Sequence, residues 1–545
     1  MSALLVLCGL PPQASAHAYI VGTEPTIGSV LTGAPQRVLI TFDEPVTIDA
    51  GAMEVLDPTG TRVDGGIVSQ PAHDRIDVQL RGARRHGTYT VSWRVTSADT
   101  HVVHGVFSFS VGRPTNVGAV RNRALASGAV PAAVTVGFSV VRGVNLLLLL
   151  ICGGGALALV FVVGDAGAEV HRRLLVALSG AALVLVLAAL GGIALQGAEV
   201  SGSNIGGGFA GSALAVVRDQ RFGAVWLARA WLAVLYASVA IAAQRASPRV
   251  RRVATRVLVA LGAALLVTPS LSGHADAAGT LYFTADLVHV LAAAAWVGGL
   301  ATMLLALALA GRDGRAALVR ASAPRLSLLA TGAVGTLMVG GVLSAIHEVG
   351  AWRGLWQSTY GELVLVKIGL GLPVLALGAL NHFVAVPALH AAADGERTRR
   401  RLVRAIGAEV ALLCAVVGVT GVLGGQPPAR NAVALTASTS MTRPVGPYRA
   451  TITTTPATVG SDRIIIELTR RARRPPEIGE VDGALRGPDG NTTQLNVTQT
   501  APLGFGAAAA AFTAAGAWEL ELTVRTGARE WLARIPIEIH PAGAL

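Results

Sequence analysis

Long apolar segments separated by short polar loops fill the middle of this chain. A helix needs about 20 apolar residues to cross a lipid bilayer. Segments of suitable length lie at 142–164, 174–198, 223–243, 253–272, 283–309, 324–346, 362–385 and 403–424. The pattern predicts a multi-pass α-helical membrane protein with about eight transmembrane helices.

Shorter runs with a two-residue period flank this apolar centre. In one run before it, Val38, Ile40 and Phe42 stand at every second position, and residues 88–95 form another run. Residues 518–524 show the same alternation after it. This is the period of a half-buried strand, and Gly and Pro turns separate the runs. We therefore predict an antiparallel β-sandwich before the helices and a second small β-sandwich after them.

These patterns divide the chain into five parts. Leu4–Leu10 is apolar and is followed by Ala14-Ser15-Ala16, a small-residue cleavage signal, so cleavage would leave His17 as the first residue. The predicted parts are a signal peptide at 1–16, a β-sandwich at 17–113, a linker at 114–128, the membrane domain at 129–425 and an extracytoplasmic β-rich domain at 426–545.

Charge predicts the topology. Only 14% of the 545 residues are charged, and the net charge of +12 comes almost entirely from arginines. The arginines gather in alternate loops, at 172–173, 245–256, 312–325 and 397–404. By the positive-inside rule these loops are cytoplasmic, so we predict both β-domains outside the cytoplasm and the helices in the cell (inner) membrane. The arginines do not cluster on one soluble surface, so we predict no nucleic-acid partner.

Several separated motifs stand in the first β-domain. They are His17-Ala-Tyr, Pro25-x-x-Gly28-x-x-Leu31, Phe42-x-Glu44-Pro45-Val46 and Ser97-Ala98-Asp99-Thr100-His101. Together they resemble the CopC family of periplasmic copper carriers. The resemblance implies an immunoglobulin-type β-sandwich that binds Cu(II) through His17, Asp99 and His101.

The chemistry of these three residues agrees with the resemblance. An amino-terminal His offers its amine and its imidazole to one ion, and an Asp-x-His pair on an extended segment points both side chains to one face. Three nitrogens and one oxygen suit tetragonal Cu(II). The alternative is that Asp99 and His101 form an ordinary polar turn. Met53 is the only methionine between His17 and the membrane domain, so we expect no Cu(I) thioether site there.

Ionisable residues lie near the outer ends of several predicted helices. Asp286 and His289 are three residues apart and share one helical face, and His274 ends the preceding helix. Charged residues inside a membrane are functional candidates, so we predict a metal-entry site at His274, Asp286 and His289. The alternative is that such residues only meet headgroups and water.

Three cations also fall within or near the outer halves of helices. For Arg142, Arg229 and Lys367 we expect snorkelling, or pairing with an acidic residue. The candidate partners are Asp286, Glu362 and Asp219.

A second set of motifs covers roughly residues 130–425. It comprises Ser270-Leu-Ser-Gly-His274-Ala, Asp286-x-x-His289, Trp296-Val-Gly298-Gly299, Thr359-Tyr-Gly361, Lys367 and Asn381. The set resembles the CopD family of copper-resistance membrane proteins, which implies copper passage across the inner membrane. The order of the two units matches a CopC–CopD fusion. We expect Met303 and Met338 to serve packing, and His382 is a weaker candidate for an exit ligand.

The predicted function is copper binding and copper transport, in the direction of uptake, linked to copper homeostasis or resistance. No Walker-type nucleotide motif is present, so ATP hydrolysis is not the expected driver, and we predict no enzyme activity. One alternative is a haem-containing or copper-reducing oxidoreductase, with His274 and His289 on the haem. Another is a membrane-anchored copper buffer. The predicted partners are copper ions, the lipid bilayer and a possible extracytoplasmic protein that binds the C-terminal domain.

Overall fold

The protein was analysed as a computed structural model. It describes residues 18–540 except for a set of short gaps. The gaps are 19, 26–28, 43, 49–50, 83–84, 98–101, 114, 116, 121–122, 125–129, 164–166, 204–208, 273–279, 311, 351, 388–394, 430–438, 456, 458–459, 472–477, 496, 502–503 and 528.

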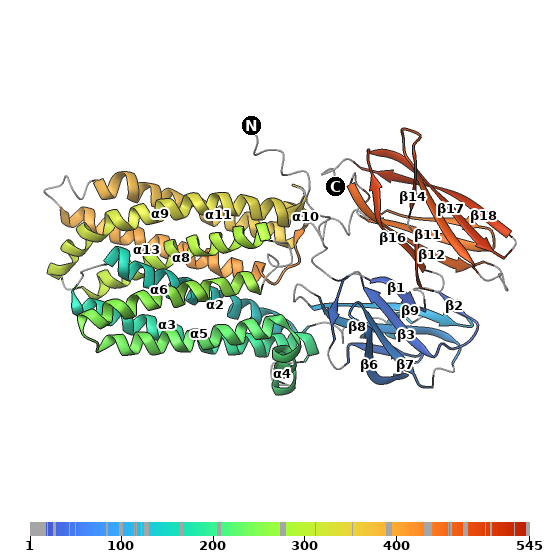
Figure 1. Cartoon of the computed structure of the whole chain (residues 1–545), viewed down its shortest axis with the longest axis horizontal. Helices are drawn as coiled ribbons and strands as arrows, with labels where there is room; N and C mark the ends of the chain where they lie inside the picture. The colour runs from blue at the N-terminus through green and yellow to red at the C-terminus, as the bar shows by residue number, and fades with distance from the viewer. Residues whose placement is uncertain are drawn as a thin grey trace.

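The N-terminal domain is built from two sheets (Figure 1). One has the order β1-β3-β7-β6, and the other has the order β2-β9-β8-β4 with β5 paired to β8. The strands are β1 (Ile20–Glu24), β2 (Val30–Leu31), β3 (Arg37–Phe42), β4 (Val46–Thr47), β5 (Met53–Leu56), β6 (Asp64–Ala72), β7 (Arg75–Leu80), β8 (Gly87–Ser97) and β9 (Val102–Val111). The alternating residues of β3 point into the shared core, where Val38, Ile40 and Phe42 are at most 2% exposed.

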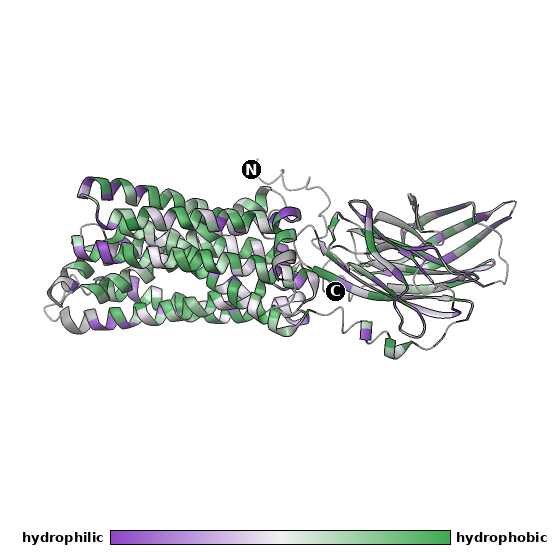
Figure 2. Ribbon diagram, turned by 90° about the horizontal axis from the view of Figure 1, so that it is seen from below, coloured by the Kyte–Doolittle hydropathy of each residue, from purple (hydrophilic) through white to green (hydrophobic). Residues whose placement is uncertain are grey.

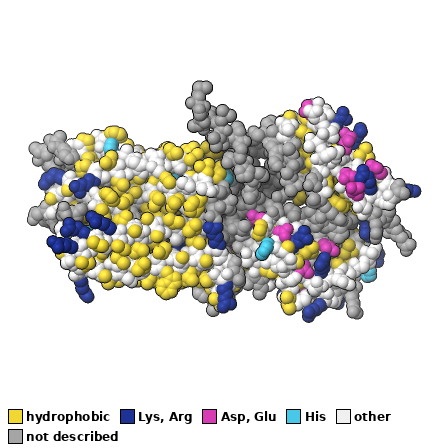
Figure 3. Space-filling model, viewed as in Figure 1, with side chains coloured by type: hydrophobic (Ala, Val, Ile, Leu, Met, Phe, Trp, Pro, Cys, Tyr) yellow, Lys and Arg dark blue, Asp and Glu magenta, His cyan; other side chains and the backbone are white. Residues whose placement is uncertain are grey.

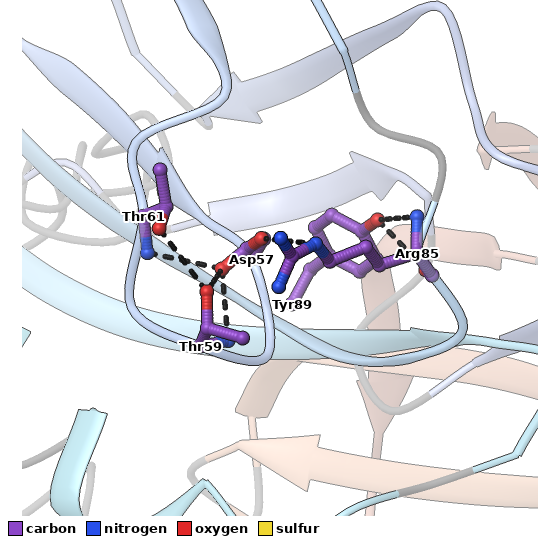
Figure 4. A network of polar contacts seen from close by, with 5 residues as sticks. All are labelled: Asp57, Thr59, Thr61, Arg85 and Tyr89. Atoms are coloured by element: carbon purple, nitrogen blue, oxygen red, sulfur yellow. Dashed lines mark hydrogen bonds and ion pairs between the residues drawn. The ribbon is translucent and has the colours of Figure 1, made fainter.

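A buried carboxylate fixes one turn of this domain. Asp57 is 4% exposed, and its Oδ1 accepts hydrogen bonds from Thr59 and from the backbone N–H of Thr61 (Figure 4). Its Oδ2 lies 3.6 Å from Arg85 Nε. The backbone of Arg85 in turn exchanges hydrogen bonds with the hydroxyl of buried Tyr89. Burial alone would raise the pKa of Asp57, but these hydrogen bonds and the guanidinium hold it below its ordinary value.

Among the described residues, the membrane domain contains eight helical spans that are long and apolar enough to cross a bilayer, which confirms the predicted number. They are formed by α2 with η1 (Ala132–Val163), α3 (Ala168–Ser201), α5 (Arg221–Gln244), α6 (Pro248–Leu271), α8 (Thr280–Leu309), α9 (Arg312–Val349), α11 with η2 (Thr359–Ala385) and α13 (Gly395–Leu423). Figure 2, in which the ribbon is coloured by hydropathy, shows these helices as built mainly from hydrophobic residues. The short helices α4 (Phe209–Asp219) and α10 (Gly354–Gln357) lie outside these spans.

The first span begins ten residues earlier than the pattern predicted. Arg142, taken as its boundary, lies inside α2 because the structure supplies it with partners. Its guanidinium stacks on the Phe138 ring at 3.7 Å and lies 3.7 Å from the Glu199 carboxylate on α3. A paired arginine can therefore stand within the apolar segment.

Glycines bring the two central helices into close contact. A side chain at Gly154 of α2 would lie 2.9 Å from the Cα of Gly298 on α8, and closer still to the carbonyl group of Ala294. The absence of a Cβ at both positions lets the backbones touch, as small residues do at membrane helix crossings. This crossing fixes the position of α8, which carries Asp286 and His289.

The C-terminal domain again has two sheets. Their orders are β10-β11-β12-β16-β15 and β14-β13-β17-β18. The strands are β10 (Thr439–Val445), β11 (Tyr448–Thr455), β12 (Gly460–Arg470), β13 (Glu480–Arg486), β14 (Thr492–Leu495), β15 (Thr498–Ala501), β16 (Gly504–Phe512), β17 (Gly516–Thr526) and β18 (Arg529–Ile539). The predicted fold class, a helical membrane domain flanked by two β-domains, is confirmed.

Both β-domains lie at the same end of the helix bundle (Figure 1). We call this the β-domain end. In Figure 3, dark-blue Lys and Arg side chains gather over the opposite end of the bundle, which we call the arginine-rich end. The loops that precede α6 and α9 reach this end.

Candidate copper sites

Asp286 and His289 lie in the part of α8 near the β-domain end, one helical turn apart. Ser270, near the end of α6, donates a hydrogen bond of 2.6 Å from its hydroxyl to Asp286 Oδ2. Lys367 of α11 interacts electrostatically with both Asp286 and His289. Asp286 is one of the acidic partners that the sequence analysis considered for Lys367.

A glycine pair on α9 makes room for the His289 imidazole. A Cβ added at Gly340 would lie 3.3 Å from His289 Nδ1, and one at Gly341 would lie 3.7 Å from its Cε1. The Nδ1 atom is buried and has no hydrogen-bond partner among the described residues. Buried polar atoms are nearly always satisfied, so this nitrogen is available to a ligand.

A second histidine lies near the same helix. The ring of His347, at the end of α9, stacks on the ring of Tyr282 with 3.8 Å between their centroids. Tyr282 precedes Asp286 by one helical turn. His347 Nε2 is also 3.9 Å from the Glu348 carboxylate. The ionisable side chains of His347 and Glu348 therefore lie between the Asp286 and His289 pair and the β-domain end.

The expectation for Arg142 and Arg229 was wrong. Arg142 pairs with Glu199 rather than with any of the three acids named. Arg229 does not snorkel: it is 2% exposed and donates hydrogen bonds of 2.8 Å to Thr268 and Asn145. Polar side chains from α2 and α6 accept the hydrogen bonds of the guanidinium inside the bundle. The sequence of α5 alone could not predict these partners, because they belong to other helices.

The predicted ligands His17, Asp99, His101 and His274 lie outside the described residues. Their described neighbours are informative for the first three. The backbone N–H of Ala18 donates a 3.1 Å hydrogen bond to the Ser97 hydroxyl, which also hydrogen-bonds Glu44. Within the described part of the chain, no three His, Cys, Asp or Glu side chains come together as a metal site.

The end of β8 lies against the membrane domain. Gln220, at the start of α5, donates a 3.4 Å hydrogen bond to the Thr96 hydroxyl. Val102, the first residue of β9, packs against a hydrophobic cluster of α2, α3 and α5. Residues 98–101 connect these two strand ends along the chain, and both strand ends touch the bundle.

Besides Glu199, sequence reasoning missed a second acidic residue of the bundle. Glu409 of α13 is 2% exposed, and it accepts hydrogen bonds of 3.1 Å from Trp296 Nε1 and from Asn381 Nδ2. Trp296 and Asn381 were noted only as parts of a motif. Glu409 was overlooked because it follows a run of arginines in the sequence. Such a run indicates the end of a membrane helix and not a buried site.

Comparisons with known proteins address the identity of these units. Family models match residues 20–112 as a CopC domain, 132–283 as the N-terminal domain of copper resistance protein D-like proteins, and 320–423 as copper resistance protein D. Over 391 residues the chain is 30% identical to copper transport protein CutJ of Bacillus subtilis, covering 70% of each chain. The chain belongs to the CopC–CopD copper transport family.

Other relatives match the two units of this CopC–CopD protein separately. Copper resistance protein D of Pseudomonas syringae pv. tomato is 28% identical over 271 residues, which is 47% of this chain and 84% of that protein. Among solved structures, CopC of Methylosinus trichosporium OB3b is 24% identical and covers 18% of this chain and 97% of its own, with a TM-score of 0.16. The predicted resemblance to both families is confirmed.

Proposed function

We propose that this protein carries copper across the cell membrane in the direction of uptake, and that it does so without catalysing a chemical reaction. The polar cluster of Asp286, His289 and Lys367 carries the proposal. Charged groups inside an apolar bundle cost free energy that a simple anchor has no reason to spend. A membrane-anchored copper buffer would need none of them.

Capture begins at a Cu(II) site formed by His17, Asp99 and His101. The hydrogen bond between Ala18 and Ser97 supports this set. Consecutive Cα atoms are about 3.8 Å apart, so chain connectivity keeps His17 next to Ala18 and Asp99 within two residues of Ser97. The two parts of the predicted site are thus tied to one edge of the sandwich.

Transfer to the bundle follows from the position of that edge. The contacts of Thr96 with Gln220, and of Val102 with the helices, hold the end of β8 and the start of β9 at the β-domain end of the bundle. An ion released there has a short path to the ionisable groups of α8 and α9. We infer that these groups, together with His274, form the entry to the membrane.

Within the entry, copper would exchange with an existing charge. Lys367 interacts electrostatically with the Asp286 carboxylate. An arriving cation replaces the attraction of Lys367 and takes the free Nδ1 of His289 as a nitrogen ligand. The arginine-rich loops lie at the other end of the bundle, and by the positive-inside rule that end is cytoplasmic, so movement away from the β-domains is uptake.

Copper accumulation in cells tests the proposal. Cells expressing the wild type, His289→Ala or His171→Ala at matched protein levels would be given trace copper. His171 is the control because it lies at the start of α3, beside Thr255 and far along the bundle from the entry. We expect lower accumulation only with His289→Ala. Equal accumulation in all three, with Cu(II) still bound by the protein, would favour the copper buffer.

A further inference from the structure

A cavity of about 200 Å³ opens in the half of the bundle nearer the arginine-rich end. Its walls come from α8, α9, α11 with η2, and α13. Most of the lining is aliphatic, but Met303, Ser327, His382 and Glu409 also line it. An apolar cavity with a few convergent polar groups is the usual form of a small-ligand site.

Glu409 lacks a cationic partner in this cavity. Its two carboxylate oxygens accept hydrogen bonds from neutral donors, the Trp296 indole and the Asn381 amide. No Lys or Arg side chain forms an ion pair with it among the residues that the structure describes. A buried carboxylate without a counter-charge is costly in a membrane, so the cavity favours a cation.

The side chains of Met303 and His382 determine which cation fits the cavity. Met303 is fully buried and brings a thioether to the wall. His382 Nδ1 lies 2.6 Å from the Ser327 hydroxyl, which orients the ring and leaves Nε2 for a ligand. Thioether sulfur and imidazole nitrogen are ligands that suit Cu(I). Met338, the other methionine of the helices, is 55% exposed on the outside of α9 and cannot reach the cavity.

The helix geometry beside the cavity is also typical of a functional site. Residues Asn381–Ala385 form a π-helical turn at the end of α11, and such turns occur frequently at functional sites. Along α8, His289, Trp296 and Met303 follow one another at seven-residue intervals and so share one face of the helix. The face that begins at the entry therefore ends at the cavity, about 21 Å further on at 1.5 Å per residue.

We propose that this cavity is a binding site for monovalent copper, with the Met303 sulfur and the His382 imidazole as ligands and the Glu409 carboxylate as counter-charge. The site takes copper that is already monovalent, so no electron transfer is part of the proposal. The choice of cargo rests on the copper transport proposed above. Binding at the cavity is a separate property that does not depend on a measured flux.

The test uses the purified full-length protein in lipid nanodiscs, titrated with Cu(I) against a competing chelator. Met303→Leu removes the sulfur while keeping an apolar side chain of similar size, and Met338→Leu is the matched control. We expect Met303→Leu to weaken Cu(I) binding about tenfold or more, since even indirect changes around metal sites cost that much. X-ray absorption should show copper–sulfur scattering that disappears in Met303→Leu and persists in Met338→Leu.

Three further outcomes test the role of Glu409, the site itself and its link to transport. Glu409→Gln keeps the size and an acceptor oxygen but removes the charge, and it should also weaken Cu(I) binding. Equal affinity and equal sulfur scattering in all variants would overturn the proposal and leave the cavity as a space for a lipid chain. If Cu(I) binds through Met303 while His289→Ala leaves cellular accumulation unchanged, the cavity site stands and the transport route fails.

Discussion

The crossing of α2 and α8 predicts a large difference between two Gly→Ala substitutions. At Gly154 the added Cβ would lie 2.9 Å from the Gly298 Cα, whereas carbon atoms in contact are about 3.5–4.0 Å apart. The added Cβ would lie closer still to the Ala294 carbonyl oxygen. Both neighbours are backbone atoms, which cannot rotate away, so the helices must separate by more than about 1 Å. Overpacking of this kind typically lowers the free energy of unfolding by about 1–3 kcal/mol.

The matched control is Gly180→Ala in α3. Nothing lies within 4 Å of a Cβ at this exposed position, so the change should be neutral or gain up to about 1 kcal/mol of helix propensity. Thermal unfolding of the full chain in one detergent, followed by tryptophan fluorescence, compares the variants. We expect Gly154→Ala to unfold several degrees below both the wild type and Gly180→Ala. Equal unfolding temperatures for the two variants would refute the close crossing.

Three other predictions follow from single contacts. The pKa of Asp57 is held below its ordinary value, so its charge stabilises the fold at neutral pH and this contribution is lost as pH falls below about 3.8. In urea, Asp57→Asn should lower the free energy of unfolding of the N-terminal domain by about 1 kcal/mol at pH 7 and by little at pH 3. The same decrease at both pH values would contradict this. Lys367→Met should lower the stability of the full chain by about 3 kcal/mol or more, because it leaves the Asp286 charge uncompensated, and Lys367→Arg should restore it. Unchanged thermal unfolding of Lys367→Met would show that the lysine only reaches for lipid headgroups. Gly340→Leu should press on His289 and reduce copper accumulation, while Gly332→Leu, where nothing lies within 4 Å, should not.

Hydropathy alone was enough to predict the eight spans, because the cost of exposing polar backbone and side chains to lipid forces long apolar segments. The strands of both β-domains were equally visible, since Val38, Ile40 and Phe42 alternate as a half-buried strand must. The family resemblance came from residues close together in sequence, such as the Asp286 and His289 pair. Local patterns of this kind can be recognised from the sequence, because they do not depend on which helices pack together.

The features that the sequence did not predict all depend on contacts between distant segments. Glu409 lies 113 residues from Trp296 along the chain, and only the packing of α8 against α13 brings them together. Arg142 was taken as a helix boundary because its partner Glu199 belongs to another helix. The two methionines of the helices look alike in sequence, yet Met303 faces a cavity and Met338 faces outward. The orientation of a helix about its own axis decides such cases.

Copper flux into liposomes tests the central claim most directly. The purified full-length protein would be reconstituted around a copper-sensitive dye, with protein-free liposomes, His289→Ala and His171→Ala in parallel. The account predicts dye quenching by external copper that is faster than in protein-free liposomes, slowed about tenfold or more by His289→Ala and unaffected by His171→Ala. Quenching by the wild type no faster than in protein-free liposomes, or equally fast in His289→Ala, would contradict a copper path through this bundle.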